Sequence, residues 1–471
     1  MPEPLWNWTD LAAAADGIAD GAPAWPIRGF SIDTRSLHPG DVFVALRDKR
    51  DGHEFVPAAF RAGAVAAIVA HDYQRGGAAN ALLRVADPLK ALTSIGRAAR
   101  LRSAARIVAI TGSVGKTGTK EMLSLCLSEL GRTHAAEKSY NNHWGVPLTL
   151  ARLPRDTEYG VFEIGMNHAG EISRLAQLVI PHEAVITTVE PVHLGHFNAV
   201  ADIAEAKAEI LTGLVPGGTA ILPRDNSHFK LLRERASGVG AKIVTFGYHQ
   251  DADFRGLQVD LGPKGSSVIA GFGTQRFPYR VGAPGEHYVK NSLAVLATLS
   301  ALGVDIMRSL PALARVSAPA GRGARTLLDT ADGQILLIDE SYNANPASVR
   351  AALAAMATTP RETYPRRVAV LGDMLELGQA AADLHRGLKD AIDAAGVDLV
   401  LACGPQMRLL FDDLTPGQRG AWAETSLALV PALIDSVCPG DVVMIKGSLG
   451  TNMAPLLAAL LARFRPARSG G

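Results

Sequence analysis

A buried-type strand followed at once by a glycine-rich loop sets strong limits on how this chain can fold. The strand is RIVAI at residues 106–110, the loop is TGSVGKT at residues 111–117, and a helical pattern follows at residues 119–130. Small loop residues let backbone N–H groups approach phosphate oxygens, and the helix directs its positive end at the same point. This order of elements predicts a phosphate-binding loop at the carboxyl edge of a parallel sheet.

The loop has the side chains that ATP and Mg²⁺ require. Its residues are Thr111, Gly112, Ser113, Val114, Gly115, Lys116 and Thr117. Lys116 can reach the β- and γ-phosphates, and the hydroxyl of Thr117 can join the magnesium coordination shell. The full GxxxxGKS/T pattern has a glycine where this chain has Ile110. A chance turn before a helix is the alternative, but the flanking strand and helix favour ATP binding.

Two further polar residues are expected near this loop. Glu163 stands close to the end of the apolar run at residues 159–165, so its carboxylate should emerge beside the loop as a magnesium ligand. A capping or surface acid is the alternative. His193 follows the apolar run at residues 183–189, again at a carboxyl end. A lone loop histidine is more often structural than a ligand, so both interpretations of His193 stay open.

Lys207 occupies the apolar stripe of a predicted helix at residues 200–214. Residues three and four positions away include Ile203, Ile210 and Leu211. One interpretation is a lysine whose stem lies along the core while its amine reaches water. The other starts from desolvation, which favours the neutral amine. A neutral amine can react with CO₂ to give a carbamate, and a carbamylated Lys207 would be an anionic ligand for magnesium.

The chain divides into three predicted blocks at residues 1–85, 86–318 and 319–471. The first mixes strands at residues 41–46 and 65–69 with a helix at residues 55–62, which predicts a small mixed α/β domain. The second alternates strands and helices, which predicts a P-loop ATPase-like parallel sheet, with an antiparallel extension at residues 253–281. The third repeats the alternation in QILLID, RVAVLGD, DLVLACG and DVVMIKG, which predicts a Rossmann-like domain. The predicted fold class is α/β.

Composition excludes several classes of protein. Lys plus Arg number 47 and Asp plus Glu number 46, so no global charge favours nucleic acid or an anionic membrane. Three separated cysteines suit a reducing compartment. The apolar run at residues 453–462 is too short to cross a bilayer and is expected to form a packed terminal helix. We expect a cytoplasmic monomer without membrane insertion.

Several segments together resemble the Mur ligases of bacterial cell-wall synthesis. TGSVGKT is similar to their ATP loop, and EIGMNHAGEI, AKAEI with Lys207, and GEHYVKNSLA with His287 and Asn291 follow in the expected order. The strings SIDTRSLHPGDVFVAL, DGHEF, NNHWGVPLTL, IDESYNANPAS and VLGDMLELG resemble the branch of the family that adds a dipeptide. Tyr288 departs from the resemblance, because the family usually has asparagine after the histidine.

The resemblance implies roles for residues in all three blocks. In the first two blocks it implies contacts with UDP-N-acetylmuramoyl-tripeptide through Ser31, Asp33, Thr34, Arg35, His53, Asn141 and Asn142. Around ATP it implies Asn291, Arg322, Asp339 and Tyr342. On the side of the acceptor, D-alanyl-D-alanine, it implies Asn343, Asn345, His385 and Lys446. Turn residues and a core histidine are the alternatives for these positions.

The implied reaction is the ATP-dependent formation of an amide bond. The tripeptide carboxylate attacks the γ-phosphate to give an acyl phosphate, and the dipeptide amine then displaces phosphate, which yields the pentapeptide precursor of peptidoglycan. The catalytic set is Lys116, Lys207, His193 and Glu163, and the metal ligands are Thr117, Glu163, His193 and carbamylated Lys207. A sister ligase that adds a single amino acid is the nearest alternative. A P-loop small-molecule kinase and a nucleotide switch are more distant ones.

Overall fold

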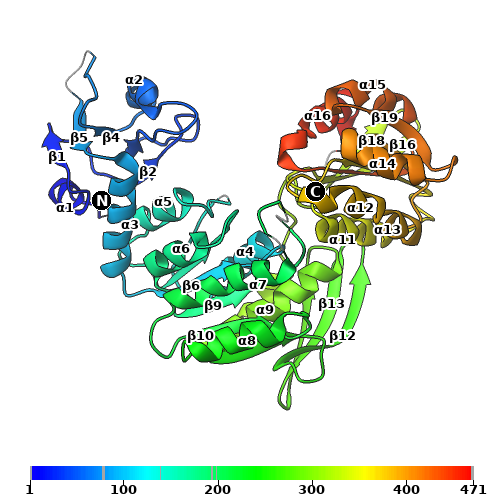
Figure 1. Ribbon diagram of the computed structural model, residues 1–471, viewed down its shortest axis with the longest axis horizontal. Coiled ribbons are helices and arrows are strands. Elements are labelled where there is room, and N and C mark those ends of the chain that lie inside the picture. The colour runs from blue at the N-terminus through cyan, green and yellow to red at the C-terminus, as the bar shows by residue number, and fades with distance from the viewer. Residues whose placement is uncertain (1–2, 77–79, 138, 193–194, 198, 468–471) are drawn as a thin grey trace.

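The computed structural model describes residues 3–76, 80–137, 139–192, 195–197 and 199–467. Three α/β units follow one another along the chain, each built on its own sheet. The second unit lies between the other two, and the first and third units stand on the same side of it, facing each other across an open space (Figure 1). The predicted α/β fold class is confirmed.

The N-terminal sheet has five strands in the order β1-β5-β4-β3-β2, with β1 antiparallel to β5 and the other pairs parallel. Its elements are α1 (Trp8–Ala14), β1 (Ile18–Asp20), β2 (Gly29–Ser31), β3 (Asp41–Val44), η1 (Gly52–Phe55), α2 (Val56–Arg61), β4 (Ala66–Ala70), β5 (Ala81–Val85) and α3 (Pro88–Leu101). The Asp87 side chain accepts hydrogen bonds from the backbone of Leu89 and Lys90, which caps the start of α3. Strands β1, β2 and β5 are additional to the predicted ones.

The central sheet has nine strands in the order β14-β13-β12-β11-β10-β9-β6-β8-β7. Its strands are β6 (Arg106–Thr111), β7 (Thr133–Ala135), β8 (Tyr159–Glu163), β9 (Glu183–Ile186), β10 (Thr219–Pro223), β11 (Lys242–Gly247), β12 (Phe254–Gly262), β13 (Gly265–Phe272) and β14 (Gln275–Val281). Strand β6 lies between β8 and β9 and is parallel to both. Because β6 is interior, its residues after Arg106 are all buried, as the apolar run predicts.

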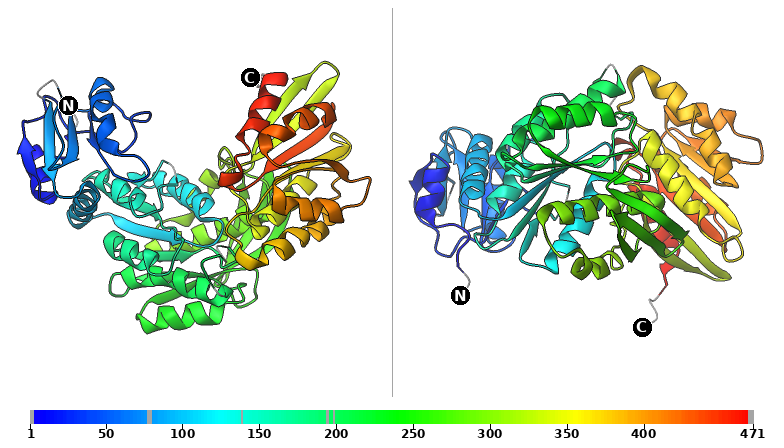
Figure 2. Two further views of the ribbon diagram at one scale, coloured as in Figure 1. Left: turned by 45° about the horizontal axis from the view of Figure 1, so that its top comes forward. Right: turned by 90° about the horizontal axis from the view of Figure 1, so that it is seen from below.

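Helices cover both faces of the central sheet (Figure 2, right). They are α4 (Lys116–Ser128), α5 (Gly145–Ala151), α6 (Glu171–Val179), α7 (Val200–Ala208), η2 (Glu209–Gly213), α8 (Phe229–Gly238), α9 (Glu286–Leu302) and α10 (Ile306–Leu313). One core cluster joins the sheet to α4, α9 and α10, and a second joins it to α5, α6, α7 and α8. The single predicted helix at residues 200–214 is thus an α-helix followed by a 3₁₀ turn.

The predicted antiparallel extension is confirmed with one difference. Strands β12, β13 and β14 form an antiparallel meander, but β12 joins the sheet by pairing in parallel with β11. The extension therefore lengthens the parallel sheet at one edge and does not form a separate layer.

The C-terminal sheet has seven strands in the order β19-β18-β17-β20-β16-β15-β21. The pairs β15–β16 and β15–β21 are antiparallel, and the other neighbours are parallel. The strands are β15 (Ala324–Thr330), β16 (Gly333–Glu340), β17 (Arg366–Gly372), β18 (Leu399–Cys403), β19 (Arg419–Ala423), β20 (Asp441–Lys446) and β21 (Arg465–Pro466). The helices are α11 (Pro346–Ala357), η3 (Gly378–Ala380), α12 (Ala381–Arg386), α13 (Lys389–Ala394), α14 (Pro405–Asp413), α15 (Ser426–Ser436), η4 (Leu449–Thr451) and α16 (Ala454–Arg463).

The terminal apolar run forms α16, which packs through Leu456 and Leu460 on one face of the C-terminal sheet. The prediction of a packed terminal helix is confirmed. Across the described parts of the chain, no helix is long and apolar enough to span a membrane.

Candidate active site

The phosphate loop follows β6 and requires glycine at two positions. Gly112 has a φ of 149°, and a Cβ there would lie 1.9 Å from the Oγ1 of Thr187. Gly115 has a φ of 86°, and a Cβ there would lie 2.6 Å from the Oδ1 of Asn291. The hydroxyl of Thr187 donates to the carbonyl of Val114 at 2.5 Å, which fixes the loop against the strand beside it. The loop shape is therefore set by tight contacts with β9 and α9.

The middle of the loop is held by the hydrogen bonds of Ser113. Its backbone N–H donates to the carbonyl of Thr188 at 2.9 Å, and its Oγ donates to the carbonyl of Glu190 at 3.1 Å. Helix α4 begins directly at Lys116, earlier than the predicted start at residue 119. The first turn of α4 thus ends the loop, as phosphate binding requires.

Lys116, Thr117 and Glu163 lie together at the carboxyl edge of the central sheet. The Nζ of Lys116 donates to the carbonyl of Gly112 at 2.7 Å. The Oγ1 of Thr117 donates to the Oε2 of Glu163 at 2.9 Å, and the Nδ2 of Asn141 donates to the Oε1 of the same carboxylate at 2.7 Å. Glu163 is only 2% exposed. Its position beside the loop is the one that the strand end predicts.

Glu163 forms no ion pair among the described residues. Both carboxylate oxygens accept from neutral donors, so hydrogen bonding satisfies them while the negative charge is not matched by a contacting cation. Hydroxyl and carboxylate oxygens are the hard ligands that Mg²⁺ prefers. The donors of Thr117 and Glu163 therefore fit the predicted magnesium ion.

The other two predicted metal ligands are His193 and Lys207. His193 lies outside the described residues. Lys207 is 1% exposed, which confirms the predicted burial, and its Nζ forms no hydrogen bond or ion pair within the described ranges. Burial lowers the pKa of Lys207 well below its ordinary value, and the charge of Lys116 lowers this pKa further while Glu209 opposes the shift. Carbamylation stays a prediction.

Arg322 brings the third unit to the phosphate loop. Its Nη2 donates to the Oγ of Ser139 at 3.3 Å, and that hydroxyl lies 3.1 Å from the Oγ1 of Thr117. The guanidinium also stacks on Tyr342, with its Cζ 4.1 Å from the ring centroid. Sequence reasoning did not find Ser139, which lies two residues before the NNHWGVPLTL segment of the resemblance.

Three further residues hold the contact between α9, the phosphate loop and the third unit: Asn291, Tyr288 and Asp339. Asn291 is 7% exposed and packs against the loop glycine Gly115. The hydroxyl of Tyr288 donates to the carbonyl of Arg322 at 3.1 Å, so the residue that departs from the family pattern joins α9 to the following unit. The carboxylate of Asp339 accepts from the backbone of Gly321 at 2.8 Å and from the Oγ of Ser341 at 2.6 Å, which holds the connecting turn.

The four residues predicted on the acceptor side all have partners inside the third unit. Lys446 is 3% exposed and donates to the Oε2 of Glu340 at 3.1 Å and to the carbonyl of Asn343 at 3.0 Å. The Oδ1 of Asn343 accepts from the backbone of Ala344. Asn345 caps α11 by accepting from the backbone of Ser348 at 2.9 Å. Direct contact of Lys446, Asn343 and Asn345 with the dipeptide stays a prediction.

His385 is held by backbone groups of the third unit, and its contact with the dipeptide stays a prediction. Its side chain is fully buried, its Nδ1 lies 2.6 Å from the carbonyl of Ala381, and its Nε2 accepts from the backbone of Met374 at 2.9 Å. Both ring nitrogens have backbone partners in this structure. His385 positions the loop after β17, which corresponds to the core-histidine alternative.

The residues predicted to bind the UDP end lie at or beyond the carboxyl ends of strands in the N-terminal sheet. Ser31 ends β2, and its Oγ donates to the carbonyl of Asp33 at 2.9 Å. Arg35 forms an ion pair with Asp33 at 2.6 Å, with Thr34 between them in the chain. His53 is 8% exposed, and its Nε2 accepts from the backbone of Ala70 at 2.9 Å. Ion pairs and hydrogen bonds thus order these residues before any ligand binds.

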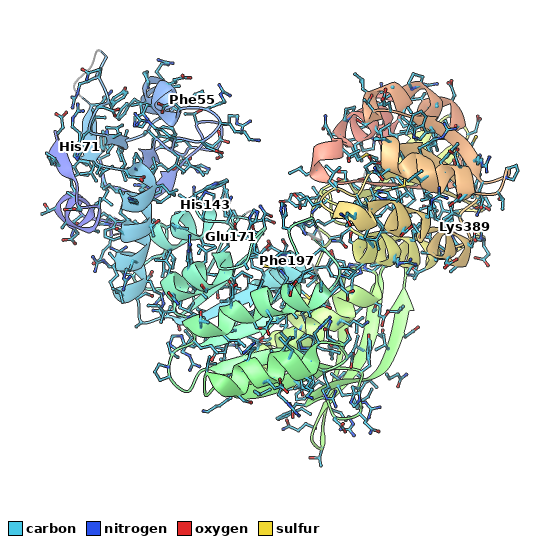
Figure 3. The ribbon with its side chains drawn as sticks, viewed as in Figure 1. Phe55, His71, His143, Glu171, Phe197 and Lys389 are labelled. Atoms are coloured by element: carbon cyan, nitrogen blue, oxygen red, sulfur yellow. The ribbon has the colours of Figure 1, made fainter. Side chains whose placement is uncertain are left out.

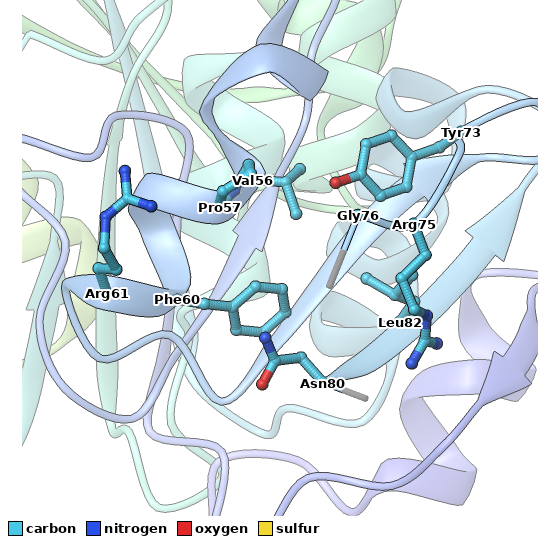
Figure 4. A pocket seen from close by; sticks show the side chains of 9 residues that line it. All are labelled: Val56, Pro57, Phe60, Arg61, Tyr73, Arg75, Gly76, Asn80 and Leu82. Carbon is cyan, nitrogen blue, oxygen red and sulfur yellow. The ribbon is translucent and has the colours of Figure 1, made fainter. Parts of the chain in front are cut away.

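A hollow of about 340 Å³ in the N-terminal unit lies beside α2 and β5 (Figure 4). Its lining includes Val56, Phe60, Tyr73 and Leu82, and none of the predicted UDP ligands is part of it. Tyr73 also lies next to His53, with ring centroids 5.6 Å apart. The hollow and the predicted UDP residues are therefore neighbouring but separate features.

Asn141 and Asn142 begin the segment before α5. Besides contacting Glu163, Asn141 accepts the backbone N–H of Gly165 through its carbonyl at 2.8 Å. The Oδ1 of Asn142 accepts from the backbone of Gly145 at 2.9 Å, at the first residue of α5. Asn141 thus links this segment to the end of β8, and Asn142 supports the start of α5.

Fold and site together define a phosphate-loop enzyme whose nucleotide site receives groups from more than one α/β unit. The sequence matches the family model of the Mur ligase middle domain over residues 110–299 and that of the Mur ligase, glutamate ligase domain, over residues 326–449. The chain belongs to the Mur ligase family.

The relatives narrow this class to one branch. The chain is 35% identical to the UDP-N-acetylmuramoyl-tripeptide--D-alanyl-D-alanine ligase of Synechocystis sp., with 93% of this chain and 92% of the relative covered. It is 33% identical to the Escherichia coli protein of the same name, with 91% and 93% covered. A crystal structure of MurF from Acinetobacter baumannii superposes with a TM-score of 0.83 at 31% identity, covering 98% of this chain and 100% of that chain.

Proposed function

We propose that this chain is an ATP-dependent ligase that adds D-alanyl-D-alanine to UDP-N-acetylmuramoyl-tripeptide and so makes the pentapeptide precursor of peptidoglycan. The observation that carries the proposal is the convergence at one phosphate loop of Lys116, Thr117 and Glu163 with Arg322 from the third unit. Relatives of that name match this chain over more than nine tenths of its length. The family supports ATP as the nucleotide.

The first step is the activation of a carboxylate that is a poor electrophile. The tripeptide carboxylate attacks the γ-phosphorus of ATP, the bond to the β–γ bridging oxygen breaks, and ADP leaves as an acyl phosphate forms. Backbone N–H groups of the loop and the ammonium of Lys116 stabilise the negative charge on the transferring phosphoryl group. Arg322, which lies one hydroxyl away from Thr117, adds a second positive charge at the same place.

The predicted magnesium ion has ligands of suitable chemistry in this chain. Thr117 and Glu163 would hold it, with His193 and carbamylated Lys207 as the further predicted ligands. When bound, the ion neutralises phosphate charge and orients the phosphate groups for in-line transfer. A neutral Lys207 amine is the form that reacts with CO₂, and the burial of Lys207 without a partner among the described residues supports that form.

The second step forms the amide bond. The free amine of the dipeptide attacks the acyl carbonyl, the tetrahedral intermediate collapses, and the carbon–oxygen bond to phosphate breaks. Water would hydrolyse the acyl phosphate in place of the amine, so the site must exclude water during the reaction. The hydrogen bonds from Arg322 to Ser139 and from Tyr288 to Arg322 are contacts through which the third unit can close the site.

The same proposal assigns residues to each part of the UDP-linked substrate. The N-terminal unit holds the UDP end through Ser31, Asp33, Thr34, Arg35 and His53, and Asn141 and Asn142 lie toward the muramoyl-peptide. The proposal includes three domains at residues 1–85, 86–318 and 319–471, a monomeric state and a cytoplasmic location. The first sheet ends at Val85 and the second begins at Arg106, which agrees with a boundary near residue 85.

One assay tests the proposal against its alternatives. Phosphate release from ATP is measured with UDP-N-acetylmuramoyl-tripeptide and either D-alanyl-D-alanine or single amino acids, and the UDP-linked product is weighed by mass spectrometry. We expect release and a pentapeptide product only with the dipeptide. A product lengthened by one amino acid would identify a sister ligase, and a stable phosphorylated product would identify a kinase.

A further inference from the structure

Two histidines lie side by side beyond the ends of β8 and β9. The rings of His168 and His196 have centroids 4.6 Å apart. His168 follows Glu163 by five residues along the segment that leaves the phosphate-loop edge, and His196 is in the segment before α7. Neither residue has a role in the two steps described above.

A carboxylate orients the first of these rings. The Nδ1 of His168 lies 3.2 Å from the Oε1 of Glu171, the first residue of α6. The other oxygen of Glu171 accepts the backbone N–H of Asn167 at 2.8 Å. When Nδ1 carries the proton and donates it to Glu171, Nε2 is left as the basic nitrogen. Such a carboxylate–histidine pair is an arrangement that favours proton acceptance.

The segment that carries His168 is fixed at both ends. Glu171 holds the backbone of Asn167, and the Oε1 of Glu209 accepts the backbone N–H of Gly170 at 2.6 Å. Glu209 also accepts from the backbone of Ser173 at 3.1 Å, inside α6. Because two carboxylates hold three backbone groups around it, the position of His168 is determined before a ligand binds, while its side chain stays 62% exposed.

The pair faces the third unit. The backbone N–H of Gly195, next to His196, donates to the carbonyl of Glu376 at 2.9 Å, in the loop after β17. Glu376 has a φ of 63°, a conformation that non-glycine residues seldom adopt. Figure 3 places Glu171 and Phe197 on the side of the central unit that faces the space between the two outer units. The two imidazoles therefore lie near a contact between the central and third units.

The second step of the proposed reaction needs a proton acceptor for the dipeptide ammonium. A dipeptide amine is an ammonium at neutral pH, and only its deprotonated form has a lone pair for attack. We propose that His168, oriented by Glu171 and lying beside His196, is the catalytic base that deprotonates the dipeptide ammonium. This inference rests on the proposed function and adds a residue to its second step.

The attack of the amine on the acyl phosphate balances in protons and electrons with the groups already named. One ammonium proton passes to the Nε2 of His168, and the amine lone pair forms the bond to the acyl carbon. The carbon–oxygen bond to phosphate breaks, phosphate leaves with that electron pair, and it takes the second nitrogen proton. The imidazolium of His168 then releases its proton to solvent.

The test compares two acceptors in the variant His168→Gln. Hydroxylamine is an uncharged amine at neutral pH, so it captures the acyl phosphate as a hydroxamate without a base. We expect kcat for D-alanyl-D-alanine ligation to fall about 10²-fold, while ATP-dependent hydroxamate formation stays within about twofold of wild type. His249→Gln is the matched control, because His249 forms a similar pair with Asp251 at 3.6 Å in the turn after β11.

The outcomes separate this inference from the proposed function. Equal losses with both acceptors would place His168 in acyl-phosphate formation or in folding and would overturn its role as the base. A raised KM for the dipeptide at unchanged kcat would make it a binding residue, and unchanged ligation would remove it from the reaction. Hydroxamate formation that fails in the wild-type enzyme would instead count against the proposed function. Glu171→Gln keeps an acceptor for Asn167 but removes the charge, so we expect a smaller fall with the dipeptide only.

Discussion

The two ends of the central sheet each hold a buried glutamate, and the two carboxylates differ in their bonding partners. At the carboxyl end, Glu163 is 2% exposed and accepts from the neutral donors Thr117 and Asn141. At the amino end, Glu183 is 1% exposed, and its Oε1 lies 2.6 Å from the Nη2 of Arg106. The first carboxylate has no contacting cation among the described residues, whereas the second has one.

The difference shows which end is prepared for a ligand. A buried carboxylate without a cation is costly unless a cation arrives, so Glu163 is poised for a metal or a metal-bound phosphate. The charge of Glu183 is already matched within the protein, and its Oε2 has no hydrogen-bond partner in the described structure. Burial raises the pKa of Glu183 to about 7, against the opposing effect of Arg106. The same residue type therefore serves binding at one end and folding at the other.

The largest effect is expected at the binding end, from Lys116→Ala. This change removes the loop ammonium, which stabilises the transferring phosphoryl group. Turnover should fall by about 10³-fold. The melting temperature should stay close to that of wild type, because the one bond of the Lys116 side chain within the described part of the chain is to the carbonyl of Gly112. Steady-state phosphate release and thermal unfolding measure the two quantities, and near-normal turnover in a folded variant would remove the loop from the reaction.

Glu163→Gln tests the comparison directly. The amide keeps the size of the side chain and can still accept from Thr117, but it removes the charge. We expect turnover to fall by about 10²-fold or more, with half-saturation shifted to higher Mg²⁺. Titration of activity with Mg²⁺ measures both effects. A fully active variant would show that the missing cation partner of Glu163 has no functional meaning.

Lys207→Arg asks whether the buried lysine contributes through its charge or through its amine. Arginine keeps a positive charge but cannot become a carbamate ligand. We expect a loss of activity of about 10²-fold that high Mg²⁺ does not restore. The matched control is Lys120→Arg, since Lys120 is equally buried but donates to the carbonyl of Ala136 and pairs with Glu121 at 2.7 Å. Mass spectrometry of the native protein with and without bicarbonate would show the carbamate, and a fully active Lys207→Arg enzyme would exclude it.

The smallest effect on activity is expected at the folding end, from Glu183→Gln. The folded pKa of Glu183, about 7, lies above the ordinary value of 4.5, so the folded state binds more protons between these values. Its stabilising contribution is complete below the unfolded pKa and is lost as pH rises through the folded pKa. Relative to the variant, wild type should therefore lose about 2–3 kcal/mol between pH 5 and pH 8.

Urea unfolding of both proteins at the two pH values measures this difference. Turnover should change little, because Glu183 begins β9 at the end of the sheet opposite the phosphate loop. A large loss of turnover with an unchanged pH profile would contradict the assignment of Glu183 to folding.

Sequence reasoning was most successful where a residue's environment depends on its own element. The apolar period of one helix predicted the burial of Lys207, and the end of one strand predicted the place of Glu163. It said least where a residue's environment depends on how a loop folds or on another unit. The ring of His385 bonds to the backbone of Ala381 and Met374, and no pattern around residue 385 reveals that both nitrogens are occupied. Ser139 was missed because its importance comes from Arg322, which is 183 residues away.

The position of β6 between β8 and β9 also has a consequence for the newly made chain. Strand β6 and the loop need partners that are synthesised later, since the Oγ1 of Thr187 fixes Val114 and the carbonyl of Glu190 accepts from Ser113. The N-terminal sheet, by contrast, is complete at Val85. Domains generally fold as units in the order in which they leave the ribosome. The emerging chain should therefore acquire a folded N-terminal sheet well before it has a nucleotide site.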